Sequence, residues 1–255
     1  MFAPVSDVAR VGQVRVKAVV AYDGTGYSGF QRQTNALSIQ AELERVLAQL
    51  VGTEVRVLAS GRTDAGVHAE GQVIAFDVEW RHPLADLQRG MNALLPEQIA
   101  LLQVSEVAPD FHPRYDAVRR HYRYTVFCAP VRSPREARMS LYVGQRIDLG
   151  ALQLAASYLV GRHDFFAFGT PPVGRNSVRE VYRAEWSTEE QFLYFDIEAN
   201  AFLQRMVRML VGSLLRVGFG ALSPTAFAEI LYTRDRAKVG PAASAKGLSL
   251  MSVSY

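Results

Sequence analysis

The chain has 255 residues, of which 49% are hydrophobic, and a formal net charge of +3. This length suits one large domain or two small ones, and no uninterrupted apolar run reaches the roughly 18 residues that indicate a membrane span. The single cysteine, Cys128, excludes an internal disulfide and a cysteine-rich metal site, and residues 1–13 lack a signal-peptide pattern, so we expect a cytoplasmic protein.

The first half of the chain shows clear hydrophobic periodicity of both the strand and the helix type. It predicts a strand over 15–22, a helix over 38–50 capped by Ser38, strands over 55–60 and 72–79, a helix over 83–95 and a strand over 99–107. The resulting order, βαββαβ, is the split-βαβ plan of ferredoxin-like and RRM folds.

The second half is longer and less regular. It predicts a strand over 117–127, a helix from Asp148 to Val160, a hairpin over 178–187 and 191–199, helices over 202–217 and 223–232, and a strand over 248–254. We interpret it as a decorated second copy of the same plan. A boundary near residues 109–113 predicts two domains, 14–111 and 112–255, in an α/β (α+β) fold.

The motif Gly61-Arg62-Thr63-Asp64-Ala65-Gly66-Val67-His68-Ala69 lies between two predicted strands. We interpret it as a loop at a sheet edge, where glycines permit sharp turns and polar side chains can perform chemistry. Asp64 could instead simply form a turn. The loop holds no second acid for a carboxylate pair, and His68 alone is weak evidence for a metal site.

Two groups of side chains add to this candidate site. Arg120, Tyr122 and Tyr124 fall on one face of a predicted strand and suit the stacking of an unpaired base, although both tyrosines could equally belong to the core. In the predicted helix 202–217, Arg205, Arg208 and Arg216 share one side. Such a stripe usually faces solvent, but an arginine pointing inward needs a carboxylate partner, for which Asp64 is a candidate.

Charge is distributed unevenly along the chain. Residues 1–111 hold 9 Lys and Arg against 13 Asp and Glu, whereas residues 112–255 hold 19 against 12. This asymmetry favours a polyphosphate partner such as a nucleic acid, with a merely solvated, arginine-rich surface as the alternative. The Gly-x-Gly of residues 22–27 lacks the rest of a nucleotide-binding motif, and we interpret His163-Asp164 as the start of a structural turn.

Taken in order, six segments of the chain resemble the tRNA pseudouridine synthase A family. The motif at 61–69 is highly specific for that family, and the similarity extends over about residues 15–255. The segments are Tyr22-Asp23-Gly24-Thr25 with Tyr27, Gly29 and Gln31; Ser60 to Ala69; Arg119 to Tyr124; Gly161 to Phe165; Asn200 to Leu203 with Met206 to Arg208; and Ala245 to Leu248.

The resemblance implies a pseudouridine synthase fold of two RRM-like domains with joined antiparallel sheets, and a homodimer that binds tRNA. It implies isomerisation of uridine to pseudouridine at positions 38, 39 and 40 of the anticodon stem-loop. That reaction involves no redox change and no net hydrolysis, so we expect no cofactor and no metal.

The resemblance also assigns roles to individual residues. Asp64 matches the catalytic aspartate, Tyr122 the tyrosine that stacks on the base, and Arg208 the arginine that pairs with the aspartate. Arg62 matches an arginine that holds the base flipped out, and Leu248 an apolar wall of the uracil pocket. We add Arg120, which shares the strand face of Tyr122, as a residue that binds substrate.

Some positions depart from the family pattern. Phe30 stands where the family usually has Trp, and Met209 where it usually has Asn. The stretch 166–168 and the insert 170–176 have their own composition, and residues 1–13 have no recognised counterpart. A non-catalytic RNA-binding module or folding helper stays an alternative, whereas a metal-dependent nuclease would need clustered carboxylates that the sequence lacks around Asp64.

Overall fold

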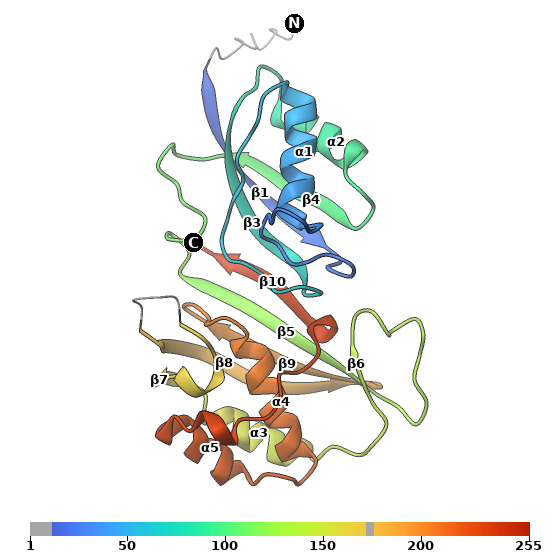
Figure 1. Ribbon diagram of the computed structural model, residues 1–255, viewed down its shortest axis with the longest axis vertical. Coiled ribbons are helices and arrows are strands. Elements are labelled where there is room, and N and C mark those ends of the chain that lie inside the picture. Colours follow the sequence, from blue (N-terminus) through green and yellow to red (C-terminus); the bar gives the residue numbers. More distant parts are fainter. Residues whose placement is uncertain (1–11, 172–175) are drawn as a thin grey trace, which may run out of the picture.

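The computed structural model describes residues 12–171 and 176–255 (Figure 1). Expectations about residues 1–11 and 172–175, including most of the first 13 residues and part of the insert 170–176, lie outside the described residues. Across the described ranges, no helix is both long and apolar enough to cross a membrane.

The N-terminal half confirms the βαββαβ order expected from periodicity. Its elements are β1 (Gln13–Tyr22), α1 (Ile39–Val51), β2 (Leu58–Ala59), β3 (His68–Glu79), α2 (Leu84–Leu94) and β4 (Ile99–Glu106). The local signals act as expected on α1, because the Ser38 side chain accepts a hydrogen bond from the Ala41 amide and Gly52 ends the helix with a φ of 78°.

The C-terminal half contains the predicted hairpin and helices together with two short strands that periodicity missed. Its elements are β5 (Arg119–Cys128), β6 (Leu141–Val143), α3 (Leu149–Ser157), β7 (Gly161–Asp164), β8 (Val178–Glu189), β9 (Phe192–Ala199), α4 (Met206–Gly218), α5 (Pro224–Thr233) and β10 (Leu248–Ser254). His163 and Asp164 end β7 and pair with β8, and the expected turn follows directly, because Asp164 Oδ1 accepts a hydrogen bond from the Phe166 amide at the start of a short 3₁₀ helix, Phe166–Phe168. Strands of three or four residues are too short to show a period.

The two halves repeat one strand order within a continuous sheet (Figure 1). The order along the sheet is β4-β1-β3-β10-β5-β9-β8-β7, with β2 also paired to β3 and β6 to β5. The N-terminal half therefore has the order β4-β1-β3-β2, and the C-terminal half has the order β10-β5-β9-β8. When the short strands β6 and β7 are left out of the count, both orders are fourth, first, third and second strand. This repetition agrees with a decorated second copy of the first plan. The ladder that joins the halves, β10 on β3, is parallel.

β2 is shorter than expected, and it shares one edge of β3 with β10. We expected a strand over 55–60, but only Leu58 and Ala59 pair, with Ala75 and Ile74 of β3. The other end of the same edge of β3, at His68 and Ala69, pairs with Ser249 and Leu250 of β10. β2 and β10 thus share one edge of β3. With the pairing to β10, β3 begins four residues before its predicted start at Gln72.

The long helix of the C-terminal half begins later than predicted, at Met206 rather than Phe202. Gln204 instead pairs with Thr170 through two backbone hydrogen bonds of 3.3 Å. Arg205 then adopts a left-handed conformation with a φ of 63°. Arg205 therefore precedes the helix and does not share the helical side of Arg208 and Arg216.

Each half has its own hydrophobic core, and the two cores meet at the β3–β10–β5 junction. Leu248 belongs to the C-terminal core and Leu250 to the N-terminal core, although they lie two residues apart on β10. Tyr122 packs against both cores. The junction is therefore where the chain brings side chains from both halves together.

Candidate active site

The glycine-containing motif leads into β3 at the point where β10 joins it. The position differs from our expectation, because β3 is an interior strand and the motif is not at a sheet edge. Its last residues, His68 and Ala69, already belong to β3. Asp64 thus lies on a short loop between the two halves, within reach of side chains from both.

Backbone and hydroxyl contacts fix the loop at Thr63, the residue before Asp64. The buried Thr63 hydroxyl lies 2.8 Å from the Tyr22 hydroxyl, and the Thr63 carbonyl accepts a hydrogen bond of 3.1 Å from the Phe30 amide. Gly29 has a φ of 93°, and a Cβ atom there would lie 2.7 Å from the Thr63 carbonyl oxygen. Glycine is therefore required for the close approach of these two segments.

A buried polar network also holds this loop in place. The Gln72 side chain accepts a hydrogen bond of 2.6 Å from the Ser60 hydroxyl and donates one of 3.0 Å to the Gly61 carbonyl. Burial raises the pKa of Tyr22 to about 12, although its hydrogen bonds with Thr63 and Gln72 act in the opposite direction. Tyr22 therefore stays a neutral hydroxyl that holds Thr63 in place.

His68 anchors the loop to segments of both halves. Its ring is fully buried; Nδ1 accepts a hydrogen bond of 3.1 Å from the Gly24 amide, and Nε2 lies 3.1 Å from the carbonyl oxygens of Arg138 and Lys246. A Cβ atom on Gly24 would lie 2.1 Å from the Val67 carbonyl oxygen. Gly24 thus allows the segment 22–27 to pack closely against the motif.

Asp64 and Arg208 are in contact, as we expected for an inward-pointing arginine. Arg208 Nη1 lies 3.1 Å from Asp64 Oδ2, and the two side chains are 19% and 24% exposed. Arg208 lies in the first turn of α4, where the helix dipole disfavours a cation, so a carboxylate partner compensates for this position. Its Nε donates a second hydrogen bond, 2.8 Å long, to the Ala243 carbonyl.

Tyr122 and Tyr124 share a face of β5 but differ in their surroundings. Tyr124 is fully buried and donates a hydrogen bond to the Ser244 carbonyl, so it is a core residue. Tyr122 is half-buried, and its ring meets that of Phe202 edge-on with centroids 5.1 Å apart. Burial raises the pKa of Tyr122, and the nearby Tyr22 and Asp64 act in the same direction. Tyr122 therefore presents a neutral phenol near Asp64.

The other expected site residues occupy three different environments. Arg62 is exposed, whereas Leu248 is buried in the C-terminal core opposite Tyr124 on β5. Arg120 is half-buried, and its guanidinium donates to backbone carbonyl oxygens.

Within the described part of the chain, no group of three or more His, Cys, Asp or Glu side chains could hold a metal ion.

Comparison with known proteins places this site in a family. The model of a family described as tRNA pseudouridine synthase matches residues 18–116 and 155–255, which include both Asp64 and Arg208. The chain belongs to the tRNA pseudouridine synthase family.

Relatives named tRNA pseudouridine synthase A agree with this assignment to the tRNA pseudouridine synthase family. One from Syntrophotalea carbinolica is 43% identical over 94% of this chain and 96% of its own length. One from Moorella thermoacetica is 44% identical over 94% and 99%. A chain from the crystal structure of the archaeal box H/ACA sRNP Nop10-Cbf5 complex matches 85% of this chain and 47% of its own with 10% identity and a TM-score of 0.36, a likeness too distant to carry an argument.

Sequence reasoning missed several buried polar residues that hold the Asp64 loop in place. Ser60, Gln72 and Tyr22 are buried polar residues whose contacts join separate strands. Tyr22 and Ser60 belong to segments that carry the family resemblance, and this membership could have indicated that they matter to the site. For Gln72 the available signal was a polar residue at the start of an otherwise apolar strand pattern.

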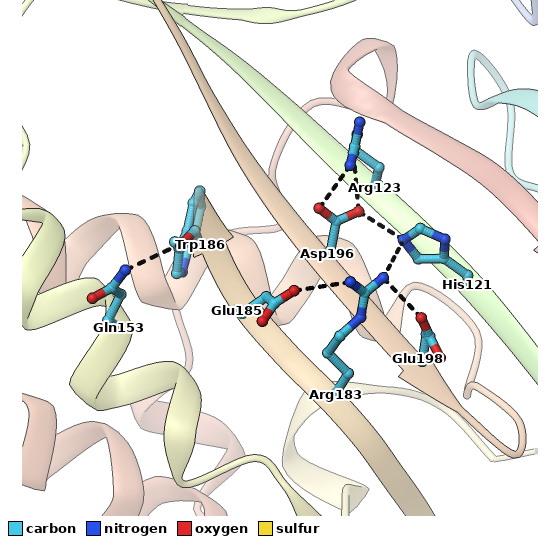
Figure 2. A network of polar contacts seen from close by, with 8 residues as sticks. All are labelled: His121, Arg123, Gln153, Arg183, Glu185, Trp186, Asp196 and Glu198. Carbon is cyan, nitrogen blue, oxygen red and sulfur yellow. Dashed lines mark hydrogen bonds and ion pairs between the residues drawn. The ribbon is translucent and has the colours of Figure 1, made fainter. Parts of the chain in front are cut away.

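A second polar network includes His121 and Arg123 of β5 (Figure 2). These two residues alternate with Tyr122 along the strand and therefore lie on its other face. Asp196 of β9 accepts hydrogen bonds of 2.6 Å from His121 and 2.9 Å from Arg123. Figure 2 also shows Arg183 beside His121 and paired with Glu198 at 2.7 Å. Burial alone would raise the pKa of Asp196, but the hydrogen bonds from His121 and Arg123 outweigh it and lower that pKa to about 2.

Replacing Asp196 with asparagine is expected to destabilise the fold in a pH-dependent way. A carboxyl pKa lowered from 3.8 to about 2 on folding stabilises the native state by about 2 kcal/mol above the unfolded pKa. Because this contribution is lost as pH falls through the folded pKa, the difference between the two proteins should shrink by about half between about pH 7 and about pH 3. Urea unfolding at a series of pH values measures it.

A matched control is Asp77→Asn, since Asp77 pairs with Arg15 but is 42% exposed. It should change the free energy of unfolding far less, because exposed ion pairs contribute little. An Asp196→Asn effect of equal size at both pH values would contradict the assignment.

Proposed function

We propose that this chain isomerises uridine to pseudouridine in the anticodon stem-loop of tRNA, at positions 38, 39 and 40. Asp64 acts as nucleophile or base, Arg208 as its counter-charge and Tyr122 as the surface on which the flipped base stacks. The observation that carries the proposal is the contact between Asp64 and Arg208, two residues that both lie within the ranges matched by the family model.

The reaction requires a charged group in a protected place and no external reagent. The N1–C1′ bond breaks, the uracil turns, and a C5–C1′ bond forms; the C5 hydrogen leaves as a proton and N1 takes one up. The Arg208 guanidinium, 3.1 Å from the Asp64 carboxylate, supplies a positive counter-charge beside it. Two routes are open to that carboxylate: attack at C1′ or C6 of the nucleotide, or abstraction of a ribose proton to give a glycal.

The site must also exclude water and accept a base taken from a helical stem. In the unbound chain the Asp64 side chain is 24% exposed, so the flipped uracil itself would complete the closure. Extruding a base costs a few kcal/mol, and the exposed Arg62 beside Asp64 is placed to offset that cost. Tyr122 and the buried Leu248 would contact the uracil from the protein side.

Assays on purified chain and tRNA test the proposal directly. We expect release of tritium from C5-labelled tRNA, and mass mapping should locate pseudouridine at positions 38, 39 or 40. Intact tRNA with no released tritium would contradict the isomerase and favour a non-catalytic RNA-binding module. Cleaved tRNA, abolished by a chelator, would instead indicate a nuclease. Sedimentation of the same preparation tests the homodimer that the resemblance implies.

Truncating Tyr122 is expected to impair turnover more than removing its hydroxyl. Tyr122→Ala removes the aromatic ring that covers the base, and loss of base–aromatic stacking costs about 1–3 kcal/mol. Tyr122→Phe keeps the ring and its contact with Phe202, so it should affect kcat/KM less unless the hydroxyl moves the C5 proton. Tritium release under single-turnover conditions compares the two variants, and equal losses would exclude stacking as the main role.

A further inference from the structure

Both terminal nitrogens of the Arg120 guanidinium donate hydrogen bonds to backbone carbonyl oxygens. Nη1 donates to the carbonyl oxygens of Ala117, 2.9 Å away, and Asn200, 2.7 Å away. Nη2 donates to those of Ser60, at 3.3 Å, and Arg114, at 2.6 Å. No carboxylate lies within ion-pair distance of Arg120 in the two ranges that the structure describes.

The four carbonyl groups belong to three segments that meet at the site. Ser60 immediately precedes the motif that carries Asp64. Asn200 follows β9 and opens the connection to α4, which carries Arg208. Arg114 and Ala117 lie in the crossover between β4 and β5, where the chain passes from one half of the sheet to the other. One side chain thus ties together the two segments that hold the Asp64–Arg208 pair.

The chemistry of the side chain suits this role. Arginine presents planar N–H donors in a fixed fork, and each bond from a charged donor is stronger than a neutral one. Burial lowers the pKa of Arg120, as expected for a cation withdrawn from water. Such a cation is retained in a half-buried place because four acceptors compensate for its lost hydration. These acceptors leave the guanidinium little capacity for a phosphate.

We propose that Arg120 is a positioning residue for the isomerisation: it sets the distance between the Asp64 loop and the start of α4, and it anchors the strand that presents Tyr122. The inference rests on the proposed function, because positioning is measured through that reaction. It competes with the expectation that Arg120 contacts tRNA directly.

The test compares Arg120→Ala with Arg119→Ala, measuring kcat, KM and the salt dependence of tRNA binding. Arg119 is a matched control, because it is the exposed neighbour on β5 whose guanidinium lies 4.4 Å from the ring centre of Tyr182. Arg120→Ala should lower kcat by about 10²-fold, as misplacement by about 1 Å can do. The affinity for tRNA and its salt slope should stay unchanged, and millimolar methylguanidinium should restore part of kcat by refilling the space.

Other results would overturn the proposal. An unchanged kcat, with a salt slope smaller by about 0.7–0.9, would show that Arg120 contacts a phosphate. A kcat loss that methylguanidinium does not restore in a folded Arg120→Ala protein would also count against positioning. If circular dichroism shows that Arg120→Ala does not fold, Arg120→Lys decides: lysine keeps the charge but cannot span four carbonyls, so kcat should fall while tRNA affinity persists. Wild-type kcat in Arg120→Lys contradicts the proposal.

Failure of the proposed function can be recognised separately. It would appear in the unmodified chain as absence of pseudouridine, before any variant is compared.

Discussion

Asp64→Asn is expected to abolish pseudouridine formation while tRNA binding persists. Asparagine has nearly the same shape and keeps the loop contacts of Thr63, but it can be neither a nucleophile nor a base at this position. Loss of such a group typically costs about 10⁴-fold or more in kcat. Tritium release from C5-labelled tRNA measures turnover, and filter binding or anisotropy measures affinity in the same preparation.

The matched control is Asp77→Asn, because Asp77 lies on β3, the strand that follows the Asp64 loop, and pairs with Arg15 at the protein surface. This variant should keep wild-type turnover. Turnover near wild type in Asp64→Asn would end the catalytic assignment, and a parallel loss of tRNA affinity would indicate a binding role instead.

Arg208→Met is expected to reduce kcat by about 10²-fold or more, the scale for removing one preorganised electrostatic partner in an active site. Methionine approximates the apolar length of arginine but leaves the Asp64 carboxylate without its cation. It also removes the hydrogen bond to the Ala243 carbonyl, which helps to hold the segment before β10. Arg208→Lys should retain part of the activity because it keeps the charge.

Arg216→Met is the control on the same helix. Arg216 also donates to a backbone carbonyl, that of Lys238 at 3.0 Å, but it lies in the last turn of α4, away from Asp64. Comparing the two variants separates loss of the ion pair from loss of a helix-to-loop tether. If Arg208→Met turns over like Arg216→Met, the ion pair contributes nothing to catalysis.

The sites of the two largest expected effects were identifiable from sequence because each lies in a short motif. Asp64, Tyr122 and Arg208 belong to three different segments, and each segment matches the family pattern locally. What periodicity could not supply was the environment. Tyr122 and Tyr124 occupy equivalent alternating positions on β5, yet Tyr124 is a core residue whereas Tyr122 lies where the two cores meet.

Arg120 illustrates the limit most clearly. Arg120 shares a strand face with two tyrosines, and this pattern predicted contact with RNA. The four backbone carbonyl groups that accept hydrogen bonds from Arg120, however, lie in segments as far as 80 residues away along the chain. Backbone carbonyl groups carry no sequence signature, so a side chain that binds them cannot be recognised before the chain is folded. The role of Gln72 was likewise not recognisable from sequence, because its hydrogen-bond partners Tyr22, Ser60 and Gly61 lie on other segments of the chain.

The sequence by itself determined the helices and most strands, since amphipathic period, the Ser38 and Asp148 caps and the glycine ends are local properties. Only the tertiary structure decided how strand edges are shared. β10, the last strand of the chain, occupies part of the edge of β3, which extends β3 into the motif and places Asp64 between the two halves. Strand pairing depends on residues about 180 positions apart, such as His68 and Ser249, and no local pattern encodes that choice.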